Sequence, residues 1–295
     1  MIPYLGEILA LSAAVVWSIA VILFKKAGET VHPLSLNLFK NTVGFVLLIP
    51  TILIVGKGSI QDISLYYYLL FIASGILGIG ISDTLFFHSL NMLGASRSAV
   101  VDLLYSPFII SLSILWIGES LSGIQVIGVM LIISGVFAVS SEKSAADISR
   151  KNLFIGILLG AGAMATMAVG IVMIKPALEN HSLLMVTQIR IIGGIIILLV
   201  ILLFHPKRKQ RFESLLFARG WKYMVPASIF GTYLALIFWL GGMKYTQAST
   251  AAALNQTSNI FIFIAAAIFL KEKINRAKLF GIGLGIPGVF MVMFG

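Results

Sequence analysis

Residues 95–139 read ASRSAVVDLLYSPFIISLSILWIGESLSGIQVIGVMLIISGVFAV, two apolar stretches separated by a short turn around Glu119. Each stretch is close to the roughly 20 residues that an α-helix needs to cross about 30 Å of hydrocarbon. In lipid every backbone amide must find its partner within the segment, so stretches this long and this apolar are predicted to be helices. The passage therefore predicts a helical membrane protein.

The composition of the whole chain agrees with this passage. Of its 295 residues, 59% are hydrophobic and 11% are charged, whereas soluble domains average about 45–50% and roughly 25%. A soluble fold needs a charged exterior, which this chain cannot supply. The chain contains no cysteine, and this excludes disulfides, thiolate metal sites and a cysteine nucleophile.

The same length criterion, applied outward from residues 95–139, predicts ten transmembrane helices in an all-α integral membrane protein. They are Tyr4–Phe24, Pro33–Val55, Leu65–Leu90, Ser98–Ile117, Leu121–Ser140, Leu153–Ile174, Ser182–Phe204, Tyr223–Met243, Ser249–Leu270 and Leu279–Gly295.

The basic residues predict the orientation of these spans. Loops on the side of the N-terminus hold only Lys57, Lys175 and Lys244, whereas loops on the other side hold 16 lysines and arginines. Cytoplasmic loops carry the excess of basic residues, so we expect a multi-pass protein of the cell membrane with both termini outside the cytoplasm. Topology thus explains the net charge of +10, and no nucleic-acid partner is expected.

An internal repeat organises the chain. A shift of 153 residues places Ala95–Val139 on Ala248–Val292 without a gap, and a shift of 150 places Lys40 on Arg190. We therefore expect two five-helix repeats, residues 1–143 and 144–295. Because five is odd, the second repeat must be inverted relative to the first. Inverted repeats are typical of secondary transporters, although a duplication kept only for stability would leave the same pattern.

Two passages resemble a known family. The stretch LSAAVVWSIAVILFKKAG, which contains Trp17, and residues 95–139 resemble the EamA-type transporters of the drug/metabolite transporter superfamily. The resemblance implies two five-helix domains and a carrier or exporter of small metabolites, amino acids or amphipathic compounds. This chain has Lys40 where the family commonly has arginine. It also has Ile260 at the position equivalent to Pro107, so a kink is expected in the first repeat alone.

Four charged residues lie near the centre of predicted spans, namely Lys40, Asp83, Asp102 and Arg190. Glu7 lies at the outer end of its span, and His88 lies near the end of another. A charge near the centre of a span costs about 2.5–3.5 kcal/mol on insertion scales, so such residues are functional candidates. Asp83 and Asp102 are the candidates for proton coupling. In the alternative interpretation, Lys40 pairs with one of these aspartates and only locks two helices together.

Helical spacing groups polar residues on shared faces. Asp102, Tyr105 and Ser106 stand at positions i, i+3 and i+4, and the repeat carries them to Asn255, Ser258 and Asn259. These stripes predict the lining of a central cavity, or else polar contacts between helices. The candidate substrate-binding or cavity residues are Asn37, Lys40, Asp102, Tyr105, Ser106, Arg190, Tyr233, Trp239, Asn255 and Asn259.

A membrane-embedded enzyme and a channel are the competing interpretations. The four histidines are scattered along the chain and form no metal-ligand motif, and neither charge rings nor a carbonyl filter is evident. We therefore predict a transporter without catalytic residues, metal or cofactor. Its partners are a small-molecule substrate and membrane lipid, and a homodimer is left open.

Overall fold

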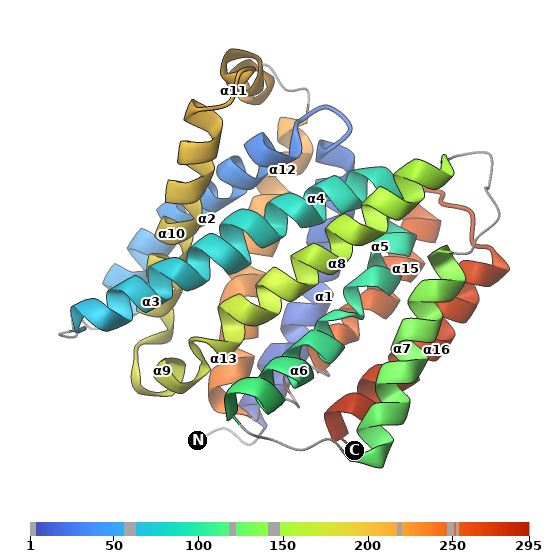
Figure 1. The fold of residues 1–295 in the computed structure, drawn as a ribbon. Coiled ribbons are helices and arrows are strands. Elements are labelled where there is room, and N and C mark those ends of the chain that lie inside the picture. Colours follow the sequence, from blue (N-terminus) through green and yellow to red (C-terminus); the bar gives the residue numbers. More distant parts are fainter. Residues whose placement is uncertain are drawn as a thin grey trace.

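The computed structural model describes residues 4–55, 63–117, 122–140, 148–216, 220–246, 251 and 254–294. Within these ranges the regular structure is entirely helical, which agrees with the predicted all-α class (Figure 1). The predicted span limits Leu121, Ser249 and Gly295 lie outside the described residues, as does Glu119.

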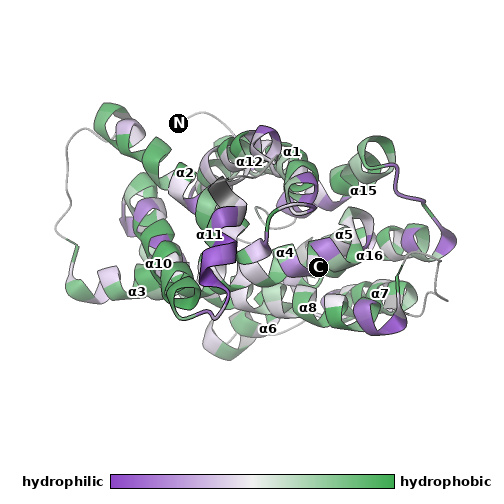
Figure 2. Cartoon of the chain, turned by 90° about the horizontal axis from the view of Figure 1, so that it is seen from above, coloured by the Kyte–Doolittle hydropathy of each residue, from purple (hydrophilic) through white to green (hydrophobic). Residues whose placement is uncertain are grey.

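Within the residues that the structure describes, six helical segments are long and apolar enough to cross a membrane. They are Leu5–Ala27, Pro33–Ile54, Leu65–Leu93, Arg150–Val172, Leu183–Leu203 and Trp221–Tyr245. Gly123–Val139 and Leu254–Phe269 are shorter apolar helices. Many large apolar side chains are exposed, such as Leu53 and Phe154, and Figure 2 shows that hydrophobic residues predominate along most of the helices. The chain is thus a multi-pass membrane protein.

The first half of the chain begins with two long helices, α1 (Leu5–Ala27) and α2 (Pro33–Val55). The next segment runs from α3 (Leu65–Gly75) through the π-helical turns of η1 (Ile76–Ile81) into α4 (Ser82–Leu93). Gly94 then turns the chain with a φ of +82°, a conformation that glycine adopts without steric cost. Three helices follow, α5 (Ala95–Asp102), α6 (Tyr105–Ile117) and α7 (Gly123–Ser140).

The second half begins with α8 (Arg150–Val172), the short α9 (Lys175–Asn180) and α10 (Leu183–Leu203). The amphipathic α11 (Arg208–Leu216) precedes a second segment with π-helical turns. This segment consists of α12 (Trp221–Ser228), η2 (Ile229–Ala235) and α13 (Leu236–Tyr245). The described chain ends with α15 (Ser258–Phe269) and α16 (Arg276–Phe294).

Helices from the two halves pack against each other in matching pairs. α4 packs against α8, and α1 packs against α13. Likewise α10 packs against α3 and η1, while α2 packs against α12 and η2. α7 and α16 form a separate close pair at one edge of the molecule, opposite α3 (Figures 1 and 2).

Glycines allow these close approaches. A Cβ atom on Gly128 would lie 2.6 Å from the carbonyl oxygen of Gly288, and one on Gly135 would lie 2.7 Å from that of Gly281. Gly128 and Gly281 are related by the 153-residue shift, as are Gly135 and Gly288. The α7–α16 interface is therefore built from the same two repeat positions on each helix, and small residues at such positions let backbones come close.

One expectation about the fourth span is wrong. The repeat lacks a second proline, so a kink was expected near Pro107 alone, yet the helix is interrupted in both halves. Leu103 and Leu104 form the break before α6, and Thr257 forms a turn before α15. The Thr257 hydroxyl donates to the Leu254 carbonyl at 2.6 Å. A threonine that bonds its own backbone can tighten a turn in this way without proline.

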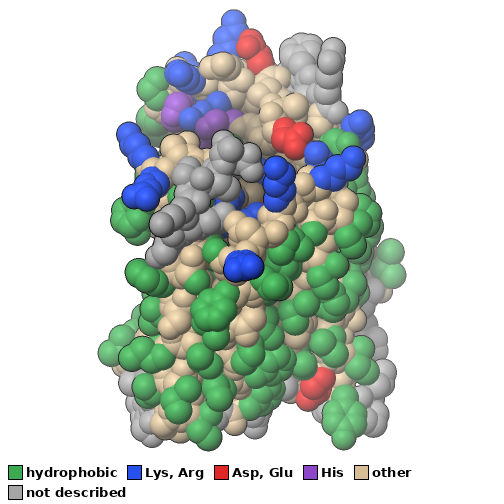
Figure 3. All heavy atoms as spheres, turned by 90° about the vertical axis from the view of Figure 1, so that its right-hand side faces the viewer, with side chains coloured by type: hydrophobic (Ala, Val, Ile, Leu, Met, Phe, Trp, Pro, Cys, Tyr) green, Lys and Arg blue, Asp and Glu red, His purple; other side chains and the backbone are tan. Residues whose placement is uncertain are grey.

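The charged residues define the two ends of the molecule. Both termini lie at one end, and lysine and arginine side chains gather at the other (Figures 1 and 3). At this basic end, Glu272 accepts hydrogen bonds from the backbone N–H groups of Ala95 (2.7 Å) and Ser96 (3.0 Å) at the start of α5. At the end that holds the termini, the Thr246 hydroxyl donates to Glu7 at 2.9 Å. Each end thus carries a contact between the two halves.

Candidate functional site

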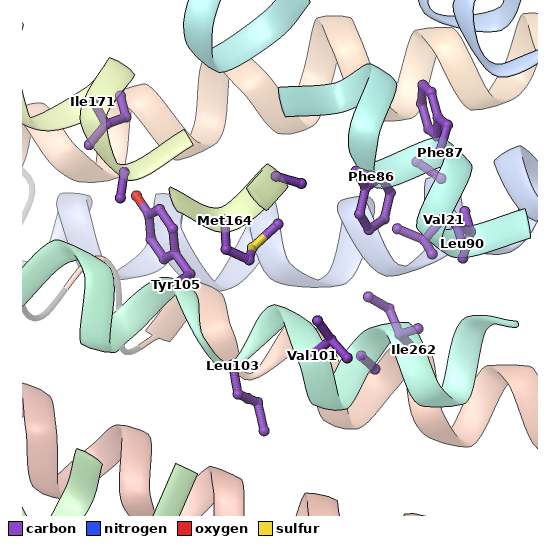
Figure 4. Close-up of a cluster of buried hydrophobic side chains, with 14 of the residues drawn as sticks. Val21, Phe86, Phe87, Leu90, Val101, Leu103, Tyr105, Met164, Ile171 and Ile262 are labelled. Carbon is purple, nitrogen blue, oxygen red and sulfur yellow. The ribbon is translucent and has the colours of Figure 1, made fainter. Parts of the chain in front are cut away.

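A cavity of about 140 Å³ lies in the middle of the helix bundle. Its charged and polar lining comprises Lys40, Asn41, Ser82, Asp83, Asp102, Tyr105, Arg190, Thr232, Asn255, Gln256, Ser258 and Asn259. Its larger apolar lining comprises Trp17, Ile79, Phe86, Met164, Met167, Leu236 and Trp239. Figure 4 shows Phe86, Tyr105 and Met164 among the buried side chains of this region. The two halves of the chain both contribute to the wall.

Equivalent positions of the repeat face the same cavity. The 150-residue shift relates Trp17 to Met167 and Lys40 to Arg190, and all four residues line it. The 153-residue shift relates seven further lining pairs, which are Gly78/Gly231, Ile79/Thr232, Ser82/Ala235, Asp83/Leu236, Phe86/Trp239, Asp102/Asn255 and Tyr105/Ser258. The wall is therefore built twice from one set of positions, but both acidic residues belong to the first half.

The π-helical segments help to place these pairs. η1 and η2 begin at Ile76 and Ile229, which are related by the 153-residue shift. Short π-helical insertions often occur at functional sites. Here Gly78 of η1 and Gly231 of η2 both line the cavity. The π-helical turns of each half are therefore part of the cavity wall.

Lys40 and Asp83 form a buried ion pair. The Nζ atom of Lys40 on α2 lies 2.6 Å from Oδ2 of Asp83 on α4, and the two residues are 4% and 6% exposed. The Phe87 ring lies 5.8 Å from the same Nζ atom. The locking interaction left open by the sequence is therefore present, and it stands in the cavity wall.

Arg190 is the second buried cation of the wall. It is 1% exposed, and its Nε, Nη1 and Nη2 atoms have no hydrogen-bond partner among the described residues. The guanidinium carbon lies 5.9 Å from the centre of the Trp239 ring. Leu236 occupies the position equivalent to Asp83, so the repeat gives Arg190 no acidic counterpart.

A band of polar groups lies on the side of the cavity formed by α5, α6 and the start of α15. Asp102 Oδ1 and the Tyr105 hydroxyl are buried and lack a hydrogen-bond partner among the described residues. The Gln256 side chain joins the two halves here, because its Nε2 donates to Ser106 Oγ at 3.2 Å and its Oε1 accepts from Asn259 Nδ2 at 2.7 Å. The Asp102 carboxyl group and the Tyr105 hydroxyl are therefore available to form hydrogen bonds with a ligand in the cavity.

Three of the predicted site residues do not line the cavity. Asn37 Nδ2 lies 2.9 Å from the Ile79 carbonyl oxygen and 3.1 Å from that of Gly80, and so serves backbone groups of η1. Ser106 is fully buried and accepts the bond from Gln256. The Tyr233 hydroxyl lies 2.6 Å from Thr51 Oγ1. The structure brings together the other seven predicted cavity residues, together with Asp83.

Sequence reasoning missed several lining residues, including Asn41, Gln256 and the two methionines. Gln256 aligns with Leu103 in the repeat, so a search for repeated polar positions could not find it. Asn41 follows Lys40 directly, and its Nδ2 donates to Asn37 Oδ1 at 2.7 Å. Asn41 stands four residues after Asn37, so the i, i+4 spacing that groups residues on one helical face could have selected it.

His88, which lies near the end of a predicted span, is not part of the cavity lining. The centre of its ring lies 5.3 Å from the centre of the His32 ring. Within the described ranges no group of three or more histidine, aspartate and glutamate side chains is placed to hold a metal ion.

Comparisons with known proteins point in one direction. The model of the EamA-like transporter family matches residues 4–141 and 154–294. An uncharacterized transporter of Archaeoglobus fulgidus is 24% identical over 97% of both chains. Another, from Methanothermobacter thermautotrophicus, is 25% identical over 76% of this chain and 62% of its own length.

A solved crystal structure is similar in fold. It superposes on 97% of this chain and 95% of its own chain with a TM-score of 0.70, at 18% sequence identity. A likeness at this identity concerns the fold alone.

Proposed function

Because the chain belongs to the EamA-like transporter family and is a membrane transporter, we propose that it is a secondary carrier that works by alternating access. Its cargo is a small metabolite, an amino acid or an amphipathic compound, and the proposed direction is export. Residues 1–143 and 144–295 are the two inverted five-helix repeats, ten transmembrane helices in all. The basic end faces the cytoplasm, and both termini face outward.

The observation that carries this proposal is the composition of the central cavity. Nine pairs of repeat-equivalent residues line one cavity. In a carrier with inverted repeats, the two halves exchange conformations around a fixed site, so that the site opens to each side in turn. A site lined by equivalent positions of both halves is what such an exchange requires.

Contacts away from the cavity also support the inverted repeat. A Cβ on Gly6 would lie 2.7 Å from Thr246, and one on Gly156 would lie 2.6 Å from Leu93. Gly156 follows Gly6 by 150 residues, and Thr246 follows Leu93 by 153. The same close approach of two helices thus occurs twice, with the halves exchanged.

Proton coupling is the second part of the proposal. Asp102 is buried, lines the cavity and has an oxygen without a hydrogen-bond partner. A carboxyl group in this situation can take up and release a proton as the cavity changes sides. Asp83 is engaged with Lys40, so Asp102 is the favoured proton carrier and Asp83 the alternative.

The proposal is tested with the full chain reconstituted in vesicles. Uptake and efflux of a metabolite panel are measured with and without a proton gradient. Asp102→Asn is expected to remove the response to the gradient, while Glu213→Gln, a change to an exposed acid on α11, is the matched control. Gradient-driven flux that survives both Asp102→Asn and the joint replacement of Lys40 and Asp83 would exclude the coupling. Flux of no compound under any gradient would exclude the carrier itself.

A further inference from the structure

Only two of the four charged groups that line the cavity form an ion pair in the described structure. Lys40 and Asp83 neutralise each other at 2.6 Å, so two charged groups are left, Arg190 and Asp102. Arg190 is a buried guanidinium with all three nitrogen atoms unpartnered among the described residues. An isolated buried charge is costly unless it is paired or hydrogen-bonded. A group that enters the cavity can supply the missing acceptor oxygens.

The form of Arg190 selects the chemistry of that group. A guanidinium is a planar fork of N–H donors that fits the two oxygens of a carboxylate. Lys40 is already paired with Asp83, so Arg190 is the cation of the described lining that is left to bind an anion, and a single guanidinium matches a monoanion better than a doubly charged phosphate. In a symmetric site an aspartate at position 236 would pair with Arg190, as Asp83 pairs with Lys40. Position 236 is a leucine, so the guanidinium of Arg190 remains available to a ligand.

The remainder of the lining restricts the rest of the ligand. Trp239 lies beside Arg190, and Trp17, Phe86, Met164 and Met167 complete an apolar wall. An apolar cavity of about 150 Å³ holds a molecule of the size of benzene, and this cavity measures about 140 Å³. The space therefore suits a short branched or small aromatic body.

We propose that Arg190 binds the carboxylate of a small monocarboxylate substrate whose apolar body lies against Trp17, Phe86 and Trp239. This inference rests on the proposed carrier function and specifies its substrate class. It also assigns the two halves different tasks, because the anion is bound by the second half and the Lys40–Asp83 pair belongs to the first.

Binding can be measured without any transport. The probes are isovalerate, its uncharged isostere isovaleramide, valine, and isobutylamine, which is valine without its carboxylate. Thermal unfolding of the full chain in detergent is followed with each probe at millimolar concentration. Isovalerate and valine are expected to raise the unfolding temperature by a few degrees, because a ligand that binds only the folded state stabilises it. Isovaleramide and isobutylamine are expected to have no effect.

Variants then connect this effect to Arg190. Arg190→Gln is expected to abolish the shift with isovalerate, Arg190→Lys to retain a reduced shift, and Lys207→Gln, at an exposed site, to leave it unchanged. Arg190→Gln should also unfold at the same or a higher temperature without ligand, since it removes an unpaired buried charge. That second measurement separates loss of binding from loss of folding.

Equal shifts with isovalerate and isovaleramide would overturn the assignment, as would no shift with either carboxylate or a full shift in Arg190→Gln. The vesicle assay distinguishes this failure from that of the carrier function. A chain that moves uncharged or cationic compounds and ignores carboxylates remains a carrier but lacks the proposed anion site.

Discussion

Lys40 on α2 and Asp83 on α4 form an ion pair at 2.6 Å inside the wall of the cavity, where both are almost completely buried. An ion pair that has lost its water is weak evidence for net stability, but removal of one partner leaves an uncompensated charge. The pair therefore ties α2 to α4 at the site and leaves Arg190 as the cation available for a ligand.

Replacement of one member of this pair should be more harmful than replacement of both. Asp83→Leu is expected to lower the free energy of unfolding by about 3–5 kcal/mol because it strands the Lys40 ammonium in a buried site. The double variant Lys40→Met with Asp83→Leu should recover most of that loss. Thermal unfolding in detergent measures both. A double variant as unstable as Asp83→Leu alone would show that the pair contributes more than mutual neutralisation.

Gly75 is expected to tolerate no side chain. A Cβ at this position would lie 1.9 Å from the backbone oxygen of Arg190, so Gly75→Ala must push α3 away from α10. Such overpacking costs about 1–3 kcal/mol or more. Gly283→Ala is the control, since nothing lies within 4 Å of its added Cβ. The yield of monodisperse protein and its unfolding temperature should fall for Gly75→Ala alone, and equal behaviour of the two variants would contradict the close packing of α3 and α10.

The orientation can be tested with reporters fused to the C-terminus. Both termini lie at the end of the molecule opposite the basic residues (Figures 1 and 3), and the basic end should be cytoplasmic. A C-terminal alkaline phosphatase fusion should be active, and a C-terminal green fluorescent protein fusion should be dark. A bright fluorescent fusion with an inactive phosphatase would reverse the orientation.

Much of the helical fold can be predicted from the sequence, because a membrane span must be long, apolar and internally hydrogen-bonded. The interruptions cannot be predicted as readily. The break at Thr257 depends on a hydroxyl that bonds to its own backbone, and the turns of η1 depend on how Asn37 serves the carbonyls of Ile79 and Gly80. Such individual side-chain hydrogen bonds to the backbone cannot be predicted from the apolar composition of a span.

The charged part of the site was more predictable than its polar part. Lys40, Asp83, Asp102 and Arg190 all line the cavity, because a charge in a span needs an environment that lipid cannot provide. Uncharged polar residues are cheaper to bury and have other uses. Ser106 and Tyr233 therefore bond to neighbouring helices, while Gln256, which no repeated pattern marked, enters the cavity wall.

The contact at the basic end offers a way to bias the carrier. Glu272 caps the start of α5 through Ala95 and Ser96, and this joins the two halves at the basic end, which the proposed orientation places at the cytoplasm. Charge-assisted hydrogen bonds of this kind contribute about 1.5–3 kcal/mol. Glu272→Gln should weaken them and shift the population towards the state that is open at the basic end, by roughly tenfold. The repeat places Glu119 at the equivalent position.

Thr232→Cys reports which side of the membrane the cavity faces. Thr232 lines the cavity and is 2% exposed, and the chain has no native cysteine. Leu103→Cys is the control, because Leu103 is fully buried and lies outside the lining. Impermeant thiol reagents are applied to right-side-out and to inside-out vesicles, and the labelling rate from each side is measured.

The reciprocity of these two rates tests alternating access most directly. In the Thr232→Cys background, adding Glu272→Gln should raise the labelling rate from the basic side and lower it from the other side, so that the ratio of the two rates changes roughly tenfold, because one cavity cannot be open to both sides at once. Leu103→Cys should label poorly in every case. Rates that rise together, or a ratio of the two rates that does not change, would contradict a single cavity with two mutually exclusive openings.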